Sequence, residues 1–480
     1  MSGLRERLGR LRGPAAAQTA PPTLPVADDE WVQLGAHIET SPAGSFVMRR
    51  REYGTDSVHG KYRLRELADC AQQLSCFHDR AAVVRHDALL FFDTETTGLG
   101  VGAGNVPFMV GIGYYTDELF TVEQLLIRNP AEEQAMLVYL QELLDRFTHI
   151  VSYNGRTFDW PILKNRYVLN RLTLDDSKLL QLDLLYPSRS LWRNTLPSCR
   201  LSKVEESRLG FERVDDVPGS MAPALYFQYL AEKNPAVLQG VFVHNEHDIV
   251  TLAALAIHFS KLLSGDMVPV PTVPSTELDD EAVSERIPAQ SAELELEELF
   301  RTGLWLDKME RFALAETFLE HLFSRLMLEP KPSNTSQHES AILQLAAFYK
   351  KKGDYLRAVD LWKRWIHIKN ASLALQLEPY LELAMYYEHR ERNLNQAIFY
   401  AEEAWAKLWR RRSLHRGDRK QNEIEEALEK RIHRLKDKLR KTENSPVREA
   451  STSRNGKPRT KATKGKTNRL KPIYVSEGLI

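Results

Sequence analysis

The sequence predicts an α/β domain with a mixed five-stranded sheet and flanking helices, followed by an all-helical region. Two observations lead to this prediction. Apolar runs of strand length alternate with helix-like segments up to about residue 265, whereas only helical spacing of apolar residues is found after residue 290. The chain has 480 residues and 43% of them are hydrophobic, so it can form two or three domains with apolar cores.

The expected α/β domain covers residues 43–265. Five apolar runs within it are expected to be strands, at 88–92, 109–115, 120–127, 149–153 and 179–185. A helix is predicted between the third and fourth strands, because Asn129 can cap it, Pro130 suits its first turn, and Glu132 lies three residues after the cap. Three strands followed by alternating helices and strands are typical of a mixed sheet.

The helical region, residues 291–440, contains three similar segments. Each has a turn followed by a helix with an early alanine, and these alanines are Ala315, Ala358 and Ala397, spaced 43 and 39 residues apart. The spacing is slightly longer than the tetratricopeptide period of about 34 residues. A small residue at this position allows close helix packing. We therefore expect a tetratricopeptide-like helical domain, with an irregular helical bundle as the alternative.

The segments outside these two domains have biased compositions. Residues 1–42 are expected to form a flexible tail, and residues 266–290, rich in proline, serine and acids, a linker. Residues 441–480 are expected to form a basic disordered tail, with ten lysines and arginines against two acids between positions 441 and 471. Such a tail can bind phosphates without sequence preference or can simply keep the protein soluble.

Whole-chain composition indicates a cytoplasmic protein. Lysine plus arginine and aspartate plus glutamate number 65 each, so the net charge favours no class of partner. The three cysteines match no zinc spacing, which favours a reduced, intracellular protein. No apolar run approaches the roughly 18 residues of a membrane span, and the N-terminus has no signal-peptide pattern. We expect no association with membranes.

Two carboxylates, Asp93 and Glu95, follow the first expected strand. Residues two apart in a strand share a face, so the two acids are expected to lie together. Like charges repel in a buried setting, and a hard divalent cation such as Mg²⁺ or Mn²⁺ removes that repulsion. The pair therefore predicts half of a metal site.

Two further segments provide acids at helix starts. Asp159 follows the fourth expected strand, and Asp248 lies in the opening turns of the last helix of the domain, four residues after His244. Asp159 can instead be a simple helix cap, and a lone histidine is more often structural than catalytic. Taken together, four acids can hold two metal ions for phosphodiester cleavage, with His244 as the base that deprotonates the water. The four carboxylates are then expected to converge in one metal-sized cluster.

The motifs resemble the DEDD superfamily of 3′–5′ exonucleases on the ribonuclease H-like fold, and more closely the bacterial YprB-like ribonuclease H-like proteins. The resemblance covers about residues 43–262 and rests on segments that match in order: His59-Gly60, Asp93-Thr94-Glu95-Thr96-Thr97-Gly98, Gly104 with Phe108 and Gly111, Gln124, Asn154-Gly155 with Phe158-Asp159, Leu182-Asp183-Leu184-Leu185, Asp216-x-Pro218-Gly219, and His244-Asn245 with Asp248. Members of that group also carry C-terminal helical repeats.

The resemblance implies a metal-dependent exonuclease acting on single-stranded DNA or RNA. It implies that Asp93, Glu95, Asp159 and Asp248 bind two Mg²⁺ or Mn²⁺ ions. One departure concerns the base, because the superfamily places histidine five residues, or tyrosine four residues, before the last aspartate. Here Val243 is at the first position and His244 at the second.

The departure at His244 keeps an alternative open. In it the chain is a nucleic-acid-binding scaffold with a weak or silent site, whose helical repeats recruit a protein partner. DNA and RNA also both remain open as substrates. Near the site, the aromatic residues Phe108, Phe158 and Trp160 are candidates for base stacking, although core packing is the more common role of such residues.

Overall fold

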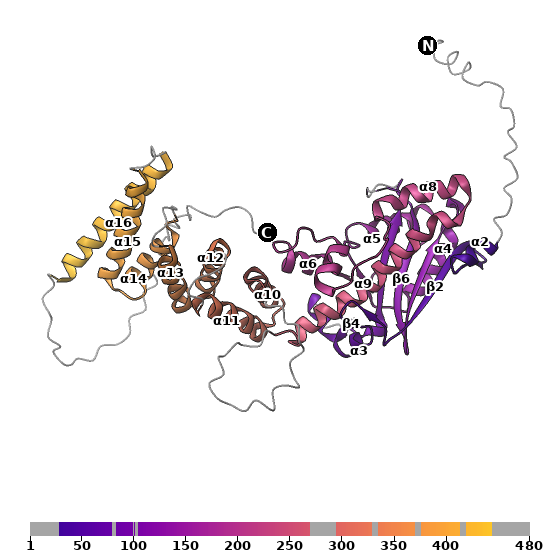
Figure 1. Cartoon of the computed structure of the whole chain (residues 1–480), viewed down its shortest axis with the longest axis horizontal. Helices are drawn as coiled ribbons and strands as arrows, with labels where there is room; N and C mark the ends of the chain where they lie inside the picture. The colour runs from indigo at the N-terminus through magenta and orange to yellow at the C-terminus, as the bar shows by residue number, and fades with distance from the viewer. Residues whose placement is uncertain are drawn as a thin grey trace, which may run out of the picture. The chain divides into compact units, whose positions relative to one another are not determined.

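The computed structural model describes residues 28–78, 83–98, 100, 104–268, 294–328, 335–369, 376–412 and 419–443. Contacts divide the chain into two compact units, Met1–Lys369 and Asn370–Ile480. The first contains the sheet together with helices α10 to α13, and the second contains helices α14 to α16 (Figure 1). The expected linker falls almost entirely, and the basic tail largely, outside the described residues.

The central sheet is mixed and has seven strands in the order β1-β2-β7-β6-β5-β8-β9. The pairs from β1 to β5 are antiparallel, and β5, β8 and β9 are parallel. The bounds of the strands are β1 Ala36–Ser41, β2 Gly44–Gly54, β5 Leu89–Thr96, β6 Pro107–Thr116, β7 Leu119–Leu126, β8 His149–Ser152 and β9 Leu180–Asp183; β3 Val58–His59 and β4 Tyr62–Arg63 form a separate hairpin.

The sheet is larger, and starts earlier, than the sequence predicts. The five expected strands are present, but β1 and β2 extend the sheet beyond β7, and β1 lies where a flexible tail was expected. Three consecutive arginines hide the strand signal of β2. Their charges are nonetheless accommodated, since Arg50 pairs with Glu123 at 2.6 Å and Arg49 with Glu246 at 2.5 Å.

Helices cover both faces of the sheet (Figure 1). Tyr139 of α4 packs on Phe46 of β2 on one face, whereas Asn245 of α9 contacts Gln124 of β7 on the other. The helices of this domain are α2 Asp28–Gln33, α3 Glu66–Cys70, α4 Glu133–Leu144, α5 Asp159–Leu169, α6 Leu185–Trp192, α7 Leu201–Val204, α8 Ala222–Glu232 and α9 Gln239–Ser264, with short helical turns η1 Ala71–Phe77, η2 His86–Ala88, η3 Pro130–Glu132, η4 Glu205–Leu209, η5 Gly219–Met221 and η6 Pro235–Leu238.

The predicted cap before α4 is present. The Asn129 side chain accepts a hydrogen bond from the backbone of Ala131 at 3.0 Å, and Pro130 begins the turn. Helix α9 begins at Gln239, earlier than expected, so His244 and Asp248 lie inside the helix rather than at its start. Over its second half the helix is buried nearly all round, which fixes its position on the sheet.

The helical region consists of α10 Leu296–Lys308, α11 Phe312–Leu328, α12 Thr335–Lys352 and α13 Tyr355–Lys369 in the first unit, and α14 Glu378–His389, α15 Leu394–Arg412 and α16 Arg419–Glu443 in the second. Each of the three predicted turns separates two helices. Glu310, Gly353 and Arg392 have left-handed backbone conformations two residues before the following helix. The early alanines of these helices are at most 2% exposed, as expected for close packing.

The first helices of this region pack directly on the α/β domain. The Trp192 indole donates to Glu298 of α10 at 3.2 Å, and the Arg208 guanidinium lies 3.2 Å from the same carboxylate. The Trp305 ring packs against the Phe259 ring of α9 in a tilted arrangement, with 5.9 Å between ring centroids. The boundary between the two units therefore falls within the helical region rather than before it.

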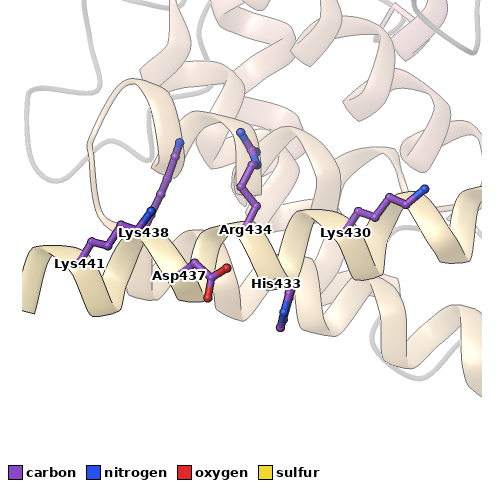
Figure 2. Close-up of a pocket in the computed structure, with 6 residues that line it drawn as sticks. All are labelled: Lys430, His433, Arg434, Asp437, Lys438 and Lys441. Carbon is purple, nitrogen blue, oxygen red and sulfur yellow. The ribbon is translucent and has the colours of Figure 1, made fainter.

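In the second unit, α16 bears a shallow basic hollow of about 490 Å³ (Figure 2). It is lined by Lys430, His433, Arg434, Asp437, Lys438 and Lys441. Beneath it, Glu388 of α14 accepts hydrogen bonds from Arg434 at 2.8 Å and Lys438 at 2.7 Å. Among the helices that the structure describes, none is long and apolar enough to cross a membrane.

Candidate active site

Strand β5 places Asp93 and Glu95 on the sheet face covered by α9. The two acids lie within the strand rather than after its end, and Asp93 is opposite Gly111 of β6. A Cβ atom at Gly111 would lie 2.1 Å from Oδ1 of Asn245, so only glycine allows α9 to approach this closely. The Asn245 amide then donates to Oδ2 of Asp93 at 3.0 Å.

A buried chain of hydrogen bonds fixes this asparagine. Arg49 of β2 donates to Oε1 of Gln124 at 2.6 Å, and Nε2 of Gln124 donates to Oδ1 of Asn245 at 2.9 Å. Because Arg49 is only a donor, it determines the orientation of both amides in turn. The Asn245 amide nitrogen is thereby directed to Asp93. This series of hydrogen bonds links β2, β7 and α9 to the Asp93 carboxylate on β5.

Asp159 is positioned by a tight turn after β8. Asn154 has a left-handed backbone with φ of 70°, and a Cβ atom at Gly155 would lie 2.6 Å from the Ser152 side chain. The Asp183 carboxylate holds this turn by accepting backbone hydrogen bonds from Asn154 at 2.8 Å, Arg156 at 3.2 Å and Leu185 at 3.1 Å.

The turn leads directly into α5, whose first residue is Asp159. The Thr94 hydroxyl of β5 donates to the Asp159 carboxylate, which ties the start of α5 to the strand that carries the first two acids. Burial raises the pKa of Asp159 to about 6. The position of Asp159 as the first residue of α5 confirms the prediction that it lies at a helix start.

Asp248 and His244 lie one turn apart on α9, in contact with a buried arginine. Nη2 of Arg213 donates to Oδ1 of Asp248 at 2.6 Å, and Nε of Arg213 donates to Glu205 at 2.6 Å. The Arg213 side chain is 5% exposed, so these are charge-assisted bonds away from bulk water. Nε2 of His244 lies 3.6 Å from Oδ2 of Asp248, and its Nδ1 lies 2.9 Å from Asp216.

The four acids form one electrostatic unit. Burial, followed by the charges of Asp248 and Asp159, raises the pKa of both Asp93 and Glu95 well above the ordinary values. Repulsion of this kind requires the carboxylates to be near neighbours in a poorly solvated place. The structure therefore places Asp159 and Asp248 within electrostatic reach of Asp93 and Glu95, and His244 beside Asp248.

The donor set fits a hard divalent cation in type and charge, because it consists of carboxylates that repel one another. In the part of the chain that the structure describes, however, no three acidic, histidine or cysteine side chains are grouped so that they could hold a metal ion. The expected metal-sized cluster is thus not formed. Asn245, Thr94 and Arg213 each hold one of the acids by a hydrogen bond.

Other sequence candidates have structural partners. Phe108 stacks on Tyr226 and Trp160 packs edge-on against Phe92; both candidates are buried, as the core interpretation expects. The neighbour of Asp248, His247, is not one of these candidates and packs against the Phe211 ring. Burial lowers its pKa.

Three positions near the acids were not predicted as site residues. Asn245, Asp216 and Arg213 contact the acids or His244 directly. The first two lie in segments that carry the family resemblance, which was their only signal. Arg213 lies in no motif, and its position depends on tertiary packing.

The fold and the group of acids define the chain as a member of the RNase H class. Residues 90–260 match the RNase H superfamily. The chain is also 30% identical over 381 residues to a protein of Bacillus subtilis (strain 168) whose name is Uncharacterized protein YprB, and the match covers 78% of this chain and 84% of that relative. The chain therefore belongs to the family of this Bacillus protein, with an RNase H superfamily domain as its α/β part.

The superfamily assignment has a general functional meaning. It favours nuclease activity, a nucleic-acid substrate and a requirement for divalent metal ions. The particular reaction, its polarity and its substrate are finer questions that depend on the residues of this site.

Proposed function

We propose that this protein is a metal-dependent 3′–5′ exonuclease that hydrolyses phosphodiester bonds of single-stranded DNA or RNA. The observation that carries the proposal is the group of Asp93, Glu95, Asp159 and Asp248, which come from three separate segments, with the charges of Asp248 and Asp159 adding to burial in raising the pKa of Asp93 and Glu95. Four carboxylates are costly to bury together, and a cation-dependent reaction on a polyanion gives them a use.

In this proposal the four acids bind two Mg²⁺ or Mn²⁺ ions. When bound, such ions supply activation of a water and stabilisation of the leaving oxygen. Asn245 holds Asp93 in one orientation, and Arg213 holds Asp248 by one carboxylate oxygen. His244 accepts the proton of the attacking water at Nε2, the ring nitrogen that faces Asp248.

Degradation of 5′-labelled single-stranded DNA and RNA, with Mg²⁺ or Mn²⁺, tests the reaction and its polarity. The wild type is expected to release products that shorten from the 3′ end, and Asp93→Ala to release none. Asp117→Asn is the matched control, because Asp117 is exposed in the β6–β7 turn and its left-handed backbone suits asparagine. Activity that persists in Asp93→Ala would exclude the two-metal proposal.

The role of His244 is tested separately. His244→Ala is expected to lower the single-turnover rate by about 10²–10⁴-fold, the range for a lost general base. Substrate affinity should change little, because the base contributes to the transition state rather than to binding. A rate near that of the wild type would assign the base to another group.

The second candidate is a nucleic-acid-binding scaffold with a silent site, whose helical repeats recruit a protein partner. Two observations favour it: the acids are not grouped to hold a metal, and α16 has a basic surface (Figure 2). It predicts tight binding of single strands without cleavage under every metal condition. Deletion of residues 441–480 is expected to weaken binding and flatten its salt dependence under either proposal.

A further inference from the structure

Asp216 contacts the imidazole of His244 from a loop that the proposed reaction does not yet use. It lies between η4 and η5, three residues before Gly219. Both of its carboxylate oxygens approach Nδ1 of His244, at 3.0 and 2.9 Å. We propose that Asp216 is a positioning residue that fixes His244 with its proton on Nδ1 and its lone pair on Nε2. The effect of Asp216 on the reaction rate rests on the proposed function, whereas the position of the proton on His244 does not.

The hydrogen-bond chemistry determines which nitrogen bears the proton. A carboxylate accepts and does not donate, so a neutral imidazole bonded to Asp216 through Nδ1 must carry its proton there. The other available partner of Nδ1 is Nη1 of Arg213, a donor that would require the opposite tautomer. That atom is 3.5 Å away, at the limit of a hydrogen bond, whereas Asp216 is at 2.9 Å.

Asp216 is itself held in place. Nη1 of Arg213 donates to its Oδ2 at 3.3 Å, and Arg213 is fixed by Glu205 and Asp248. The Asp216 side chain is 16% exposed and that of His244 15%, so water competes only partly for these bonds.

The same loop confines the other side of the ring. A Cβ atom built at Gly219 would lie 3.0 Å from Nε2 of His244, so glycine avoids crowding this nitrogen, which also faces Oδ2 of Asp248 at 3.6 Å. Asp216 therefore holds one nitrogen while Gly219 leaves room at the other. This gives a physical reason for the Asp216-x-Pro218-Gly219 segment, and it shows how a histidine four residues before Asp248 can be oriented without the spacing usual in the superfamily.

The tautomer can be observed directly in the full-length, metal-free protein labelled with ¹⁵N-histidine. Spectra are recorded at rising pH until the His244 signals no longer change, so that they report the neutral ring. The His244 signals are identified by their loss in His244→Gln. We expect the wild type to show a protonated Nδ1 and an unprotonated Nε2. A wild-type ring with its proton on Nε2 would overturn the proposal without any variant.

Asp216→Asn and Asp215→Asn form a matched pair, since the neighbouring Asp215 is exposed. Asp216→Asn is expected to shift the ring-nitrogen signals and to lower the single-turnover rate by about 10–100-fold, the usual loss for an orienting partner. Asp215→Asn should change neither. Mg²⁺ affinity, measured by calorimetry, should stay within about threefold in both.

Two results would contradict the positioning role. Unchanged ring-nitrogen signals in Asp216→Asn would show that Asp216 does not set the tautomer. Loss of Mg²⁺ affinity with an unchanged tautomer would instead make Asp216 a metal ligand. If the wild type cleaves no substrate, the proposed function fails, but the spectra still decide whether Asp216 orients His244.

Discussion

The substitution Asp159→Asn is expected to stabilise the metal-free protein while abolishing cleavage. Asparagine keeps the shape of the side chain and an oxygen that can accept the Thr94 hydrogen bond, but it removes a buried charge. The pKa of Asp159 is raised from 3.8 to about 6. Each pH unit corresponds to about 1.4 kcal/mol, so ionised Asp159 destabilises the folded state by on the order of 3 kcal/mol at neutral pH.

The pH dependence has a definite sign. Because the folded-state pKa is above the unfolded one, protonation favours the folded protein, and the penalty falls as pH decreases through 6 toward 3.8. The difference between Asp159→Asn and the wild type should therefore be largest at pH 7 or above. It should narrow steadily down to a pH of about 4.

Denaturant unfolding in the presence of a chelator, repeated across this pH range, measures the difference. At neutral pH the free energy of unfolding of Asp159→Asn should exceed that of the wild type by about 3 kcal/mol. Asp117→Asn, at an exposed turn, is the control and should change the free energy of unfolding by little. A variant no more stable than the wild type at pH 7 would refute the view that burial of this charge destabilises the fold. Mg²⁺ should then stabilise the wild type more than the variant, because ligand binding adds stability only where a site exists.

Three further substitutions test other contacts. Asn245→Leu should lower the single-turnover rate by about 10–100-fold and the unfolding free energy by about 2 kcal/mol, because Asp93 loses its donor and a buried glutamine amide loses its acceptor; an unchanged rate would mean that Asp93 needs no such support. Gly60→Ala should cost about 2 kcal/mol or more, since φ is +58° and the new Cβ would lie 2.2 Å from the Leu209 carbonyl oxygen; Gly54→Ala is the control in open space, and equal stability of the two would contradict this reason. Burial lowers the pKa of His258, so the contribution of this residue to stability should fall by up to about 1.4 kcal/mol per pH unit below 6.5; the difference in stability between His258→Asn and the wild type should therefore change with pH in an acid unfolding series, and a difference independent of pH would refute this role of His258.

Much of the fold can be predicted from local patterns in the sequence. The apolar runs of β5 to β9 and the cap at Asn129 are signals that act over a few residues, and the structure has them where expected. Strands β1 and β2, which the sequence analysis did not predict, show the limit of local patterns. Arg49 and Arg50 look like surface residues in the sequence, and only tertiary partners such as Glu246 and Glu123 make a buried strand position tolerable for them.

The site divides in the same way. The four acids and His244 could be singled out because they lie in short motifs next to apolar runs, although only Asp159 begins a regular element in the structure. The spatial arrangement of these residues could not be predicted, because it depends on the guanidinium of Arg213, which lies in a different segment of the sequence. Arg213 contacts Asp248 across 35 residues, and Gln124 reaches Asn245 across 121. Contacts at such separations have no local signature, and they decide how the acids are spaced.

The contact between Trp192 and Glu298 has a consequence for how the molecule unfolds. The same carboxylate accepts from the indole and pairs with Arg208, while Arg311 of the next turn donates to Gln73 at 3.0 Å. A fragment that lacks α10 would expose the indole to water and lose its buried hydrogen bond to Glu298. The described residues up to Lys369 should accordingly melt in a single cooperative transition, and a protease acting after Met267 should yield an α/β domain that is less stable than the same residues within the intact chain.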